Sequence, residues 1–262
     1  MSAFESAGSA APVACACAEA ERTGAAEFGA DTCAVIVAGG TGERFGDPRG
    51  KQFVELCGLP ILCWSLVAFD RAPSVARLVV VCAPDRRAEV EKDVLARVKL
   101  SKPVVLAASG TTRQESVFSG LLEVPRELTY VAVHDAARPL VEVELIERAI
   151  AAVRADAKLS GAILAARSID TLKLVEGTTI IATPDRSYYW CAQTPQVFRT
   201  KALVSAHKAA RWDEYQGTDD ASLVERHGGR VAVVESSRDN IKVTIPEDLA
   251  LAETMLGQRL LS

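Results

Sequence analysis

No Cys-x-x-Cys pair occurs in this 262-residue sequence, and its three histidines stand apart from any cysteine cluster. The seven cysteines are odd in number and scattered through apolar segments, which is not the pattern of a disulfide framework or a zinc site. The sequence therefore predicts reduced cysteines in a cytoplasmic protein.

Long apolar runs are also missing. No 18 consecutive apolar residues occur, whereas a membrane-spanning helix needs about 20. The first thirty residues lack the basic start and apolar core of a secretory signal, and their acidic residues are unlike an organelle transit peptide. We expect residues 1–30 to form a disordered tail, followed by a single domain over residues 31–262.

Positive charge is not in excess, because 30 Lys and Arg face 34 Asp and Glu, for a net charge of −4. Non-specific nucleic-acid binding depends on phosphate neutralisation, so this balance argues against nucleic acid as a partner. A local basic cluster can still hold a small phosphate ligand, since net charge says little about one cleft.

Apolar strand-like runs alternate with amphipathic helical patterns along most of the chain. The runs lie at residues 33–38, 77–82, 104–107, 130–134 and 161–165, and the helical patterns at 60–69, 84–97, 113–122 and 143–155. This alternation predicts an α/β fold, a three-layer Rossmann-like arrangement around a mostly parallel sheet. Ligands of such sheets bind beyond the carboxyl ends of the strands, so we expect the chemistry just after Ala38, Ala107 and His134.

Residues 168–190 interrupt this alternation. Two β-like runs flank a Glu176-Gly177 turn, which predicts a hairpin arm. A lone hairpin is marginally stable in water, so we expect the arm to rest on a second subunit. The remaining pattern predicts helices at 200–212 and 219–227, strands at 230–234 and 240–244, and a last helix from residue 246.

A glycine-rich loop, AGGTGERFG at residues 38–46, follows the first strand. Glycines at such a place let backbone N–H groups cradle phosphate oxygens, although a plain strand-to-helix turn is the alternative for the loop alone. The Walker pattern fails because Gln52 follows Lys51, and the dinucleotide fingerprint fails because the glycine spacing is one residue too long. Arg44 and Lys51 suit nucleotidyl transfer, since fixed cations stabilise the charge that builds on the α-phosphate.

These residues belong to an ordered series of motifs: AGGTGER (38–44), KQ (51–52), GTTRQESV (110–117), VHDAARP (133–139), DTLK (170–173), QTPQ (193–196), TDD (218–220) and DNIKVT (239–244). Over about residues 33–255 the series resembles 2-C-methyl-D-erythritol 4-phosphate cytidylyltransferase of the non-mevalonate isoprenoid pathway. The resemblance implies transfer of CMP from CTP to 2-C-methyl-D-erythritol 4-phosphate, with release of pyrophosphate. Ribitol-5-phosphate cytidylyltransferase shares these motifs and is one alternative; a non-catalytic nucleotide-binding protein is another, against which Arg44 and Lys51 argue.

The resemblance also implies roles for individual residues. The catalytic cations would be Arg44 and Lys51, with Arg186 and Lys242. The nucleotide would be held by Ala38, Gly39, Gly40 and Gly42, and the cytosine by Gly110, Thr111, Ser116 and Ala136 on a loop supported by Arg113. Magnesium would be bound by Asp135, with Asp239 as a second ligand. The substrate phosphate would be gripped by Arg138, Thr171, Arg186, Thr218 and Lys242, and Arg186 would act across a homodimer.

Several of these residues also have plainer interpretations. Asp135 can be a helix cap at a strand end, Thr218 can begin a helix as its N-cap, and Lys242 can be an edge lysine. We interpret His134 as a structural histidine. A general base is not required, because a phosphate monoester with a second pKa of about 6 is already largely dianionic at neutral pH. One departure from the family pattern is Gly50, where a proline is usual.

Overall fold

The computed structural model describes residues 29–40, 45 and 49–261. The tail predicted for residues 1–30 therefore lies almost wholly outside the described residues, as do Gly42 and Arg44. Within the described part, no helix is both long and apolar enough to cross a membrane.

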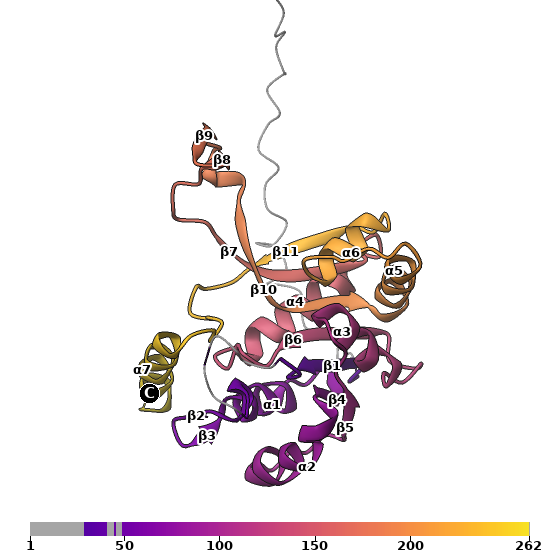
Figure 1. The fold of residues 1–262 in the computed structure, drawn as a ribbon. Helices are drawn as coiled ribbons and strands as arrows, with labels where there is room; N and C mark the ends of the chain where they lie inside the picture. Colours follow the sequence, from indigo (N-terminus) through magenta and orange to yellow (C-terminus); the bar gives the residue numbers. More distant parts are fainter. Residues whose placement is uncertain (1–28, 41–44, 46–48, 262) are drawn as a thin grey trace, which may run out of the picture.

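A seven-stranded sheet forms the centre of the fold, in the order β11-β7-β10-β6-β1-β4-β5 (Figure 1). Its strands are β1 (Thr32–Val37), β4 (Val75–Cys82), β5 (Val104–Ala108), β6 (Tyr130–Asp135), β7 (Gly161–Arg167), β10 (Trp190–Arg199) and β11 (Val231–Glu235). Only β10 runs antiparallel to its neighbours, β6 and β7. The predicted mostly parallel α/β sheet is confirmed.

Helices cover both faces because successive strand residues point to opposite sides. On β1, Ala34 and Ile36 join a core shared with α1 (Ile61–Arg71) and α4 (Val143–Ala155). Cys33 and Val35 instead join a core formed with α3 (Arg113–Leu122), α5 (Thr200–Trp212) and α6 (Asp220–Arg226). Strands buried on both faces need continuous apolar runs, which is why the sequence pattern located them.

Strand β10 was not predicted, although it lies between β6 and β7 near the middle of the sheet. Its polar QTPQ segment includes Pro195, and proline is rare in central strands because it cannot donate to the ladder. The pairing with β7 shifts between Ala192 and Gln196, and this irregularity spans the proline.

Two other predictions need correction. Residues 84–97 do not form one regular helix: 3₁₀ turns at Pro84–Arg86 and Leu95–Arg97 flank a short α2 (Arg87–Glu89) and a π turn at Val90–Val94. Residues 240–244 belong to no sheet. Their backbone is held by single contacts instead, such as Val243 N–H donating to the Ala137 carbonyl at 2.8 Å.

The smaller elements lie toward the two ends of the molecule. At one of them are a 3₁₀ turn at Lys51–Phe53 and the short ribbon β2 (Glu55–Leu56) and β3 (Leu59–Pro60), which packs near α7 (Pro246–Leu261). The arm is the hairpin β8 (Leu174–Glu176) and β9 (Thr179–Ala182), which stands away from the sheet (Figure 1). The predicted hairpin is therefore present, and its seven strand residues are all exposed.

Candidate active site

The loops after β1, β5 and β6 meet at the carboxyl edge of the sheet. Val37 of β1 pairs with Asp135 of β6, so the glycine-rich loop starts beside Ala136. A Cβ atom on Gly39 would lie 2.3 Å from the Cβ of Ser109, so only glycine lets the β1 loop approach the β5 loop this closely. The structure thus brings together three of the segments in which the sequence placed the site.

The loop before α3 is held in shape by a capping box. Thr112 Oγ1 accepts from Glu115 N–H at 3.1 Å, and the Glu115 carboxylate accepts from the backbone N–H groups of Thr111 and Thr112. Ser116 Oγ accepts from Gly110 N–H at 3.1 Å. The predicted cytosine-binding residues of this loop therefore lie on a turn that is held by the hydrogen bonds of the chain itself.

Asp135 ends β6 between two cations. Its Oδ1 accepts from Arg113 Nε at 3.0 Å and its Oδ2 from Lys242 Nζ at 2.7 Å. Burial alone raises the pKa of this carboxyl, but Arg113 and Lys242 outweigh that effect and hold the pKa well below its usual range. Asp135 is therefore ionised throughout the neutral range, with a cation on each oxygen.

The Lys51 side chain reaches the chain segment that carries Lys242. Lys51 Nζ donates to the carbonyl of Val243 at 3.2 Å, next to the residue that pairs with Asp135. Gly50 precedes Lys51 with φ 94°, a conformation that proline cannot adopt because its ring fixes φ near −65°. Gly50, which stands where the family usually has proline, thus adopts a backbone conformation that requires glycine. Lys51 is still directed to the site.

Arg138 binds two backbone carbonyl groups. Its guanidinium donates to the carbonyls of Asn240 at 2.6 Å and Ala192 at 3.4 Å. Desolvation lowers its pKa. These contacts tie β10 to the segment that carries Lys242, and the predicted contact of Arg138 with a substrate phosphate stays a prediction.

Within the described chain, no hydrogen bond or ion pair joins the other predicted residues to the cluster of Asp135, Arg113 and Lys242. Asp239 is exposed and lines a hollow of about 340 Å³ with Met255, Gln258 and Arg259 of α7. Thr171 and Arg186 lie on the exposed arm, and Thr218 is exposed just before α6. Gly42 and Arg44 lie outside the described residues.

Sequence reasoning assigned no role to Thr194, yet it supports the end of β6. Its Oγ1 accepts from Asp135 N–H at 3.0 Å and lies 3.0 Å from His134 Nδ1. His134 is fully buried, and its Nε2 lies 3.2 Å from the Arg138 carbonyl. Thr194 was missed because its strand, β10, was missed; the QTPQ motif was the available signal.

The free energy of unfolding is expected to fall as the pH drops below about 6.5. Burial lowers the pKa of His134 to about 3, so the unfolded chain takes up a proton that the folded chain refuses. Stability should decrease by about 1.4 kcal/mol per pH unit in this range. Urea unfolding should give a value about 2 kcal/mol lower at about pH 5 than at about pH 7.5. His134→Gln should flatten this dependence, and an equal slope in both proteins would contradict the assignment.

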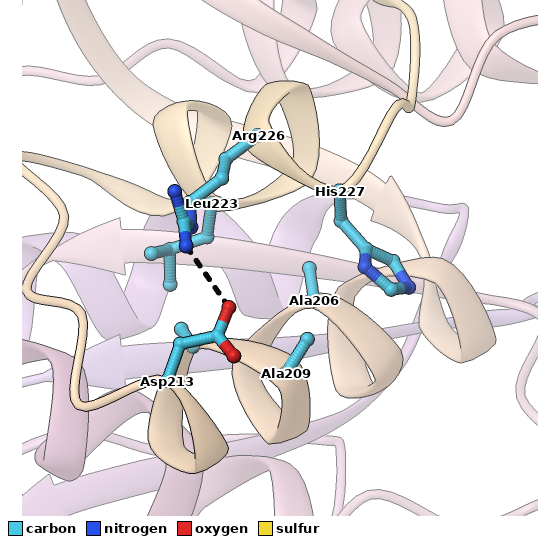
Figure 2. Close-up of a pocket in the computed structure, with 7 residues that line it drawn as sticks. Ala206, Ala209, Asp213, Leu223, Arg226 and His227 are labelled. Atoms are coloured by element: carbon cyan, nitrogen blue, oxygen red, sulfur yellow. Dashed lines mark hydrogen bonds and ion pairs between the residues drawn. The ribbon is translucent and has the colours of Figure 1, made fainter.

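A second hollow, of about 220 Å³, lies between α5 and α6 (Figure 2). Asp213 and Arg226 form an ion pair of 2.9 Å across it, and Ala206, Leu223 and His227 also contribute to its wall. None of the residues predicted for the site lines it.

Comparison with known proteins shows the family of the chain. Residues 32–258 match the IspD family, described as 2-C-methyl-D-erythritol 4-phosphate cytidylyltransferase. Proteins of that name from Prochlorococcus marinus and Geobacillus kaustophilus are 44% and 41% identical, over 86% and 87% of this chain and 98% and 97% of theirs. The crystal structure of 4-diphosphocytidyl-2C-methyl-D-erythritol synthase from Anaerococcus prevotii matches with a TM-score of 0.76 at 28% identity, covering 86% of this chain and 96% of that one.

The fold, the charged strand ends and these matches define an enzyme of the nucleotidyltransferase class, and within it a cytidylyltransferase. The chain belongs to the 2-C-methyl-D-erythritol 4-phosphate cytidylyltransferase family. The resemblance stated from the sequence motifs is confirmed.

Proposed function

We propose that this enzyme transfers CMP from CTP to 2-C-methyl-D-erythritol 4-phosphate and releases pyrophosphate, a step of isoprenoid precursor synthesis. The observation that carries the proposal is the Asp135 cluster. It places a lysine and an arginine against one carboxylate, beside the strand end where the glycine-rich loop begins. Family membership supports both the nucleotide and the acceptor.

In the proposed reaction the substrate phosphate attacks the α-phosphorus of CTP in line. The phosphate is already largely dianionic at neutral pH, so the protein need not remove a proton. Its contribution is to position both reactants and to stabilise the charge that develops on the transferring phosphorus. Lys51 and Lys242 both lie along this edge: Lys242 donates to Asp135, and Lys51 donates to the carbonyl of the next residue, Val243.

Magnesium is the metal included in this proposal. Asp135 suits it as a hard, ionised oxygen donor, since Mg²⁺ is commonly bound through one or two carboxylates together with substrate phosphates. In the described residues no group of three or more His, Cys, Asp or Glu side chains gathers to hold a metal, so phosphate oxygens would complete the shell. When bound, the ion would neutralise charge on the triphosphate. Asp239 as a second ligand stays a prediction.

The test is pyrophosphate release with CTP and Mg²⁺, comparing 2-C-methyl-D-erythritol 4-phosphate with ribitol 5-phosphate. Turnover with the first acceptor at a much higher kcat/KM is the expected result. A preference for ribitol 5-phosphate would replace the acceptor and keep the chemistry. Binding of CTP without turnover on either acceptor would instead indicate a non-catalytic nucleotide-binding protein.

The proposal includes a homodimer joined through the arm. The hairpin exposes several apolar side chains, with Leu174, Ile180 and Ile181 each more than half exposed and Val175 close to that level. An isolated hairpin is marginally stable in water, and burial of these side chains against a second copy would stabilise it. Arg186 follows the hairpin and is exposed, which would allow it to reach the site of the partner.

Mixing two inactive variants should restore activity if Arg186 acts across the dimer. In a mixed dimer of Lys51→Ala and Arg186→Ala, one site keeps Lys51 and receives the intact Arg186 of the other protomer, whereas the second site lacks both. Random exchange of protomers should therefore recover about a quarter of the wild-type kcat. The measurement is turnover after co-refolding of equal amounts. Recovery no greater than the sum of the two variants would place Arg186 in its own protomer's site.

The proposed location is the cytoplasm. The five cysteines in the described part of the chain are all free thiols, and two of them, Cys57 and Cys191, are exposed. Exposed free thiols persist in a reducing compartment, which supports this location.

A further inference from the structure

Behind the Asp135 cluster lies a second carboxylate, Asp220, to which neither the sequence motifs nor the proposed reaction gives a role. Its side chain is 1% exposed. Arg113 NH1 donates to Asp220 Oδ2 at 2.7 Å while Arg113 Nε donates to Asp135 Oδ1 at 3.0 Å. One guanidinium therefore joins the site carboxylate to the buried one.

The chain of contacts continues to α5. His207 Nε2 lies 3.0 Å from Asp220 Oδ1, and the imidazole is fully buried. An ionised carboxylate only accepts hydrogen bonds, so the His207 Nε2 carries the hydrogen. Asp220 thus has one oxygen committed to Arg113 and the other to His207. Helices α5, α6 and α3 each contribute one residue to a line that ends at Asp135.

We propose that Asp220, fixed by His207, is a positioning residue for the transfer reaction, acting through Arg113 on Asp135. This inference rests on the proposed cytidylyltransferase function. A guanidinium is planar and its N–H donors point in fixed directions, so an anion anchored on its far side sets its position. Asp135 in turn accepts from Lys242, and the arrangement of both charged groups depends on where Arg113 lies.

Charge balance gives Asp220 a second effect. Asp220, Arg113, Asp135 and Lys242 form an alternating row of two anions and two cations. Without the charge of Asp220, Arg113 would be left with Asp135 as its only carboxylate partner among these contacts. Asp135 would then be drawn more strongly toward Arg113 and would bind Lys242 less strongly.

The test variant is Asp220→Asn, which keeps the side-chain shape and removes the charge. We expect kcat for CMP transfer to fall about 10–100-fold, the usual cost of removing an outer-shell partner. The dissociation constant for CMP, measured by calorimetry, should stay within about threefold of wild type, because the cytosine loop is held by its own capping box. A fall in kcat with CMP binding retained separates positioning from loss of fold.

The matched control is Asp31→Asn. Asp31 also pairs with an arginine, Arg154, but it lies beside the first residue of β1, at the opposite end of the strand from the site. It should lower the thermal unfolding midpoint as Asp220→Asn does and leave kcat unchanged. Equal kcat losses in the two variants would mean a general effect on stability and would overturn the proposal.

His207→Phe provides a second, independent variant if Asp220→Asn does not fold. Phenylalanine keeps the ring that stacks near Phe118 and removes only the contact with Asp220. We expect kcat to fall about threefold to tenfold, the equivalent of one hydrogen bond, again with CMP affinity retained. Wild-type kcat in a folded variant of Asp220 or His207 would overturn the inference. An inactive wild-type enzyme would instead refute the proposed function.

Discussion

Replacing Lys51 with alanine is expected to lower kcat by about 10²–10³ while leaving the protein folded. The ammonium group is a compact charge at the edge of the site, where it donates a 3.2 Å hydrogen bond to the Val243 carbonyl. If Lys51 stabilises charge that appears on the α-phosphorus only in the transition state, its loss lowers kcat and kcat/KM together. The measurement is steady-state pyrophosphate release with CTP and the methylerythritol phosphate acceptor.

Lys201→Ala is the matched control for this variant. Lys201 is exposed on α5, so its loss should change neither turnover nor unfolding. The wild-type unfolding midpoint should be nearly retained in Lys51→Ala, because its hydrogen bond to the Val243 carbonyl is only part-buried and a bond of this kind contributes about 1 kcal/mol. A kcat within a few-fold of wild type would remove Lys51 from the catalytic groups.

Asp135→Asn should reduce both activity and stability, which distinguishes it from the lysine variant. The amide cannot match the charge of Arg113 and Lys242, and its NH₂ group faces one of the two cations. We expect a loss of about 2–3 kcal/mol in the free energy of unfolding. This is less than for a fully buried pair because the Lys242 side chain is 39% exposed and partly screened by water.

The kcat of Asp135→Asn is expected to fall by about 10²–10³, since the variant changes the arrangement of the cations and removes the proposed metal ligand. Turnover should be measured below the unfolding transition of the variant, over a series of Mg²⁺ concentrations. Asp239→Asn in the same assay asks whether Asp239 acts with Asp135: a similar loss would place them together. Full activity of Asp135→Asn would contradict the site as described.

The layered fold was predictable because burial on both faces of a parallel sheet leaves a local signature. Runs of apolar residues such as 77–82 have few alternatives to a buried strand, and the predicted helix at 113–122 begins and ends at the predicted residues. In the structure this helix begins where the Thr112 side chain caps it. These features depend on neighbours a few residues apart.

Other elements lack such a signature. The polar β10 segment gains its strand geometry from β6 and β7 on either side, and the 240–244 segment is held in place by Arg138 and Ala137 rather than by a ladder. The local patterns instead predict no strand at 190–199 and a strand at 240–244. In both places, contacts with residues distant in the chain decide the backbone conformation.

The sequence alone determined the six parallel strands of the sheet, the hairpin arm, the loops that carry the site and, through its ordered motifs, the family. Only the tertiary structure decided which charges meet. Lys242 pairs with Asp135, and Asp220 with Arg113, each across 107 positions in the chain. No local pattern records such a contact, because ion pairing depends on burial and distance in space rather than on spacing along the chain.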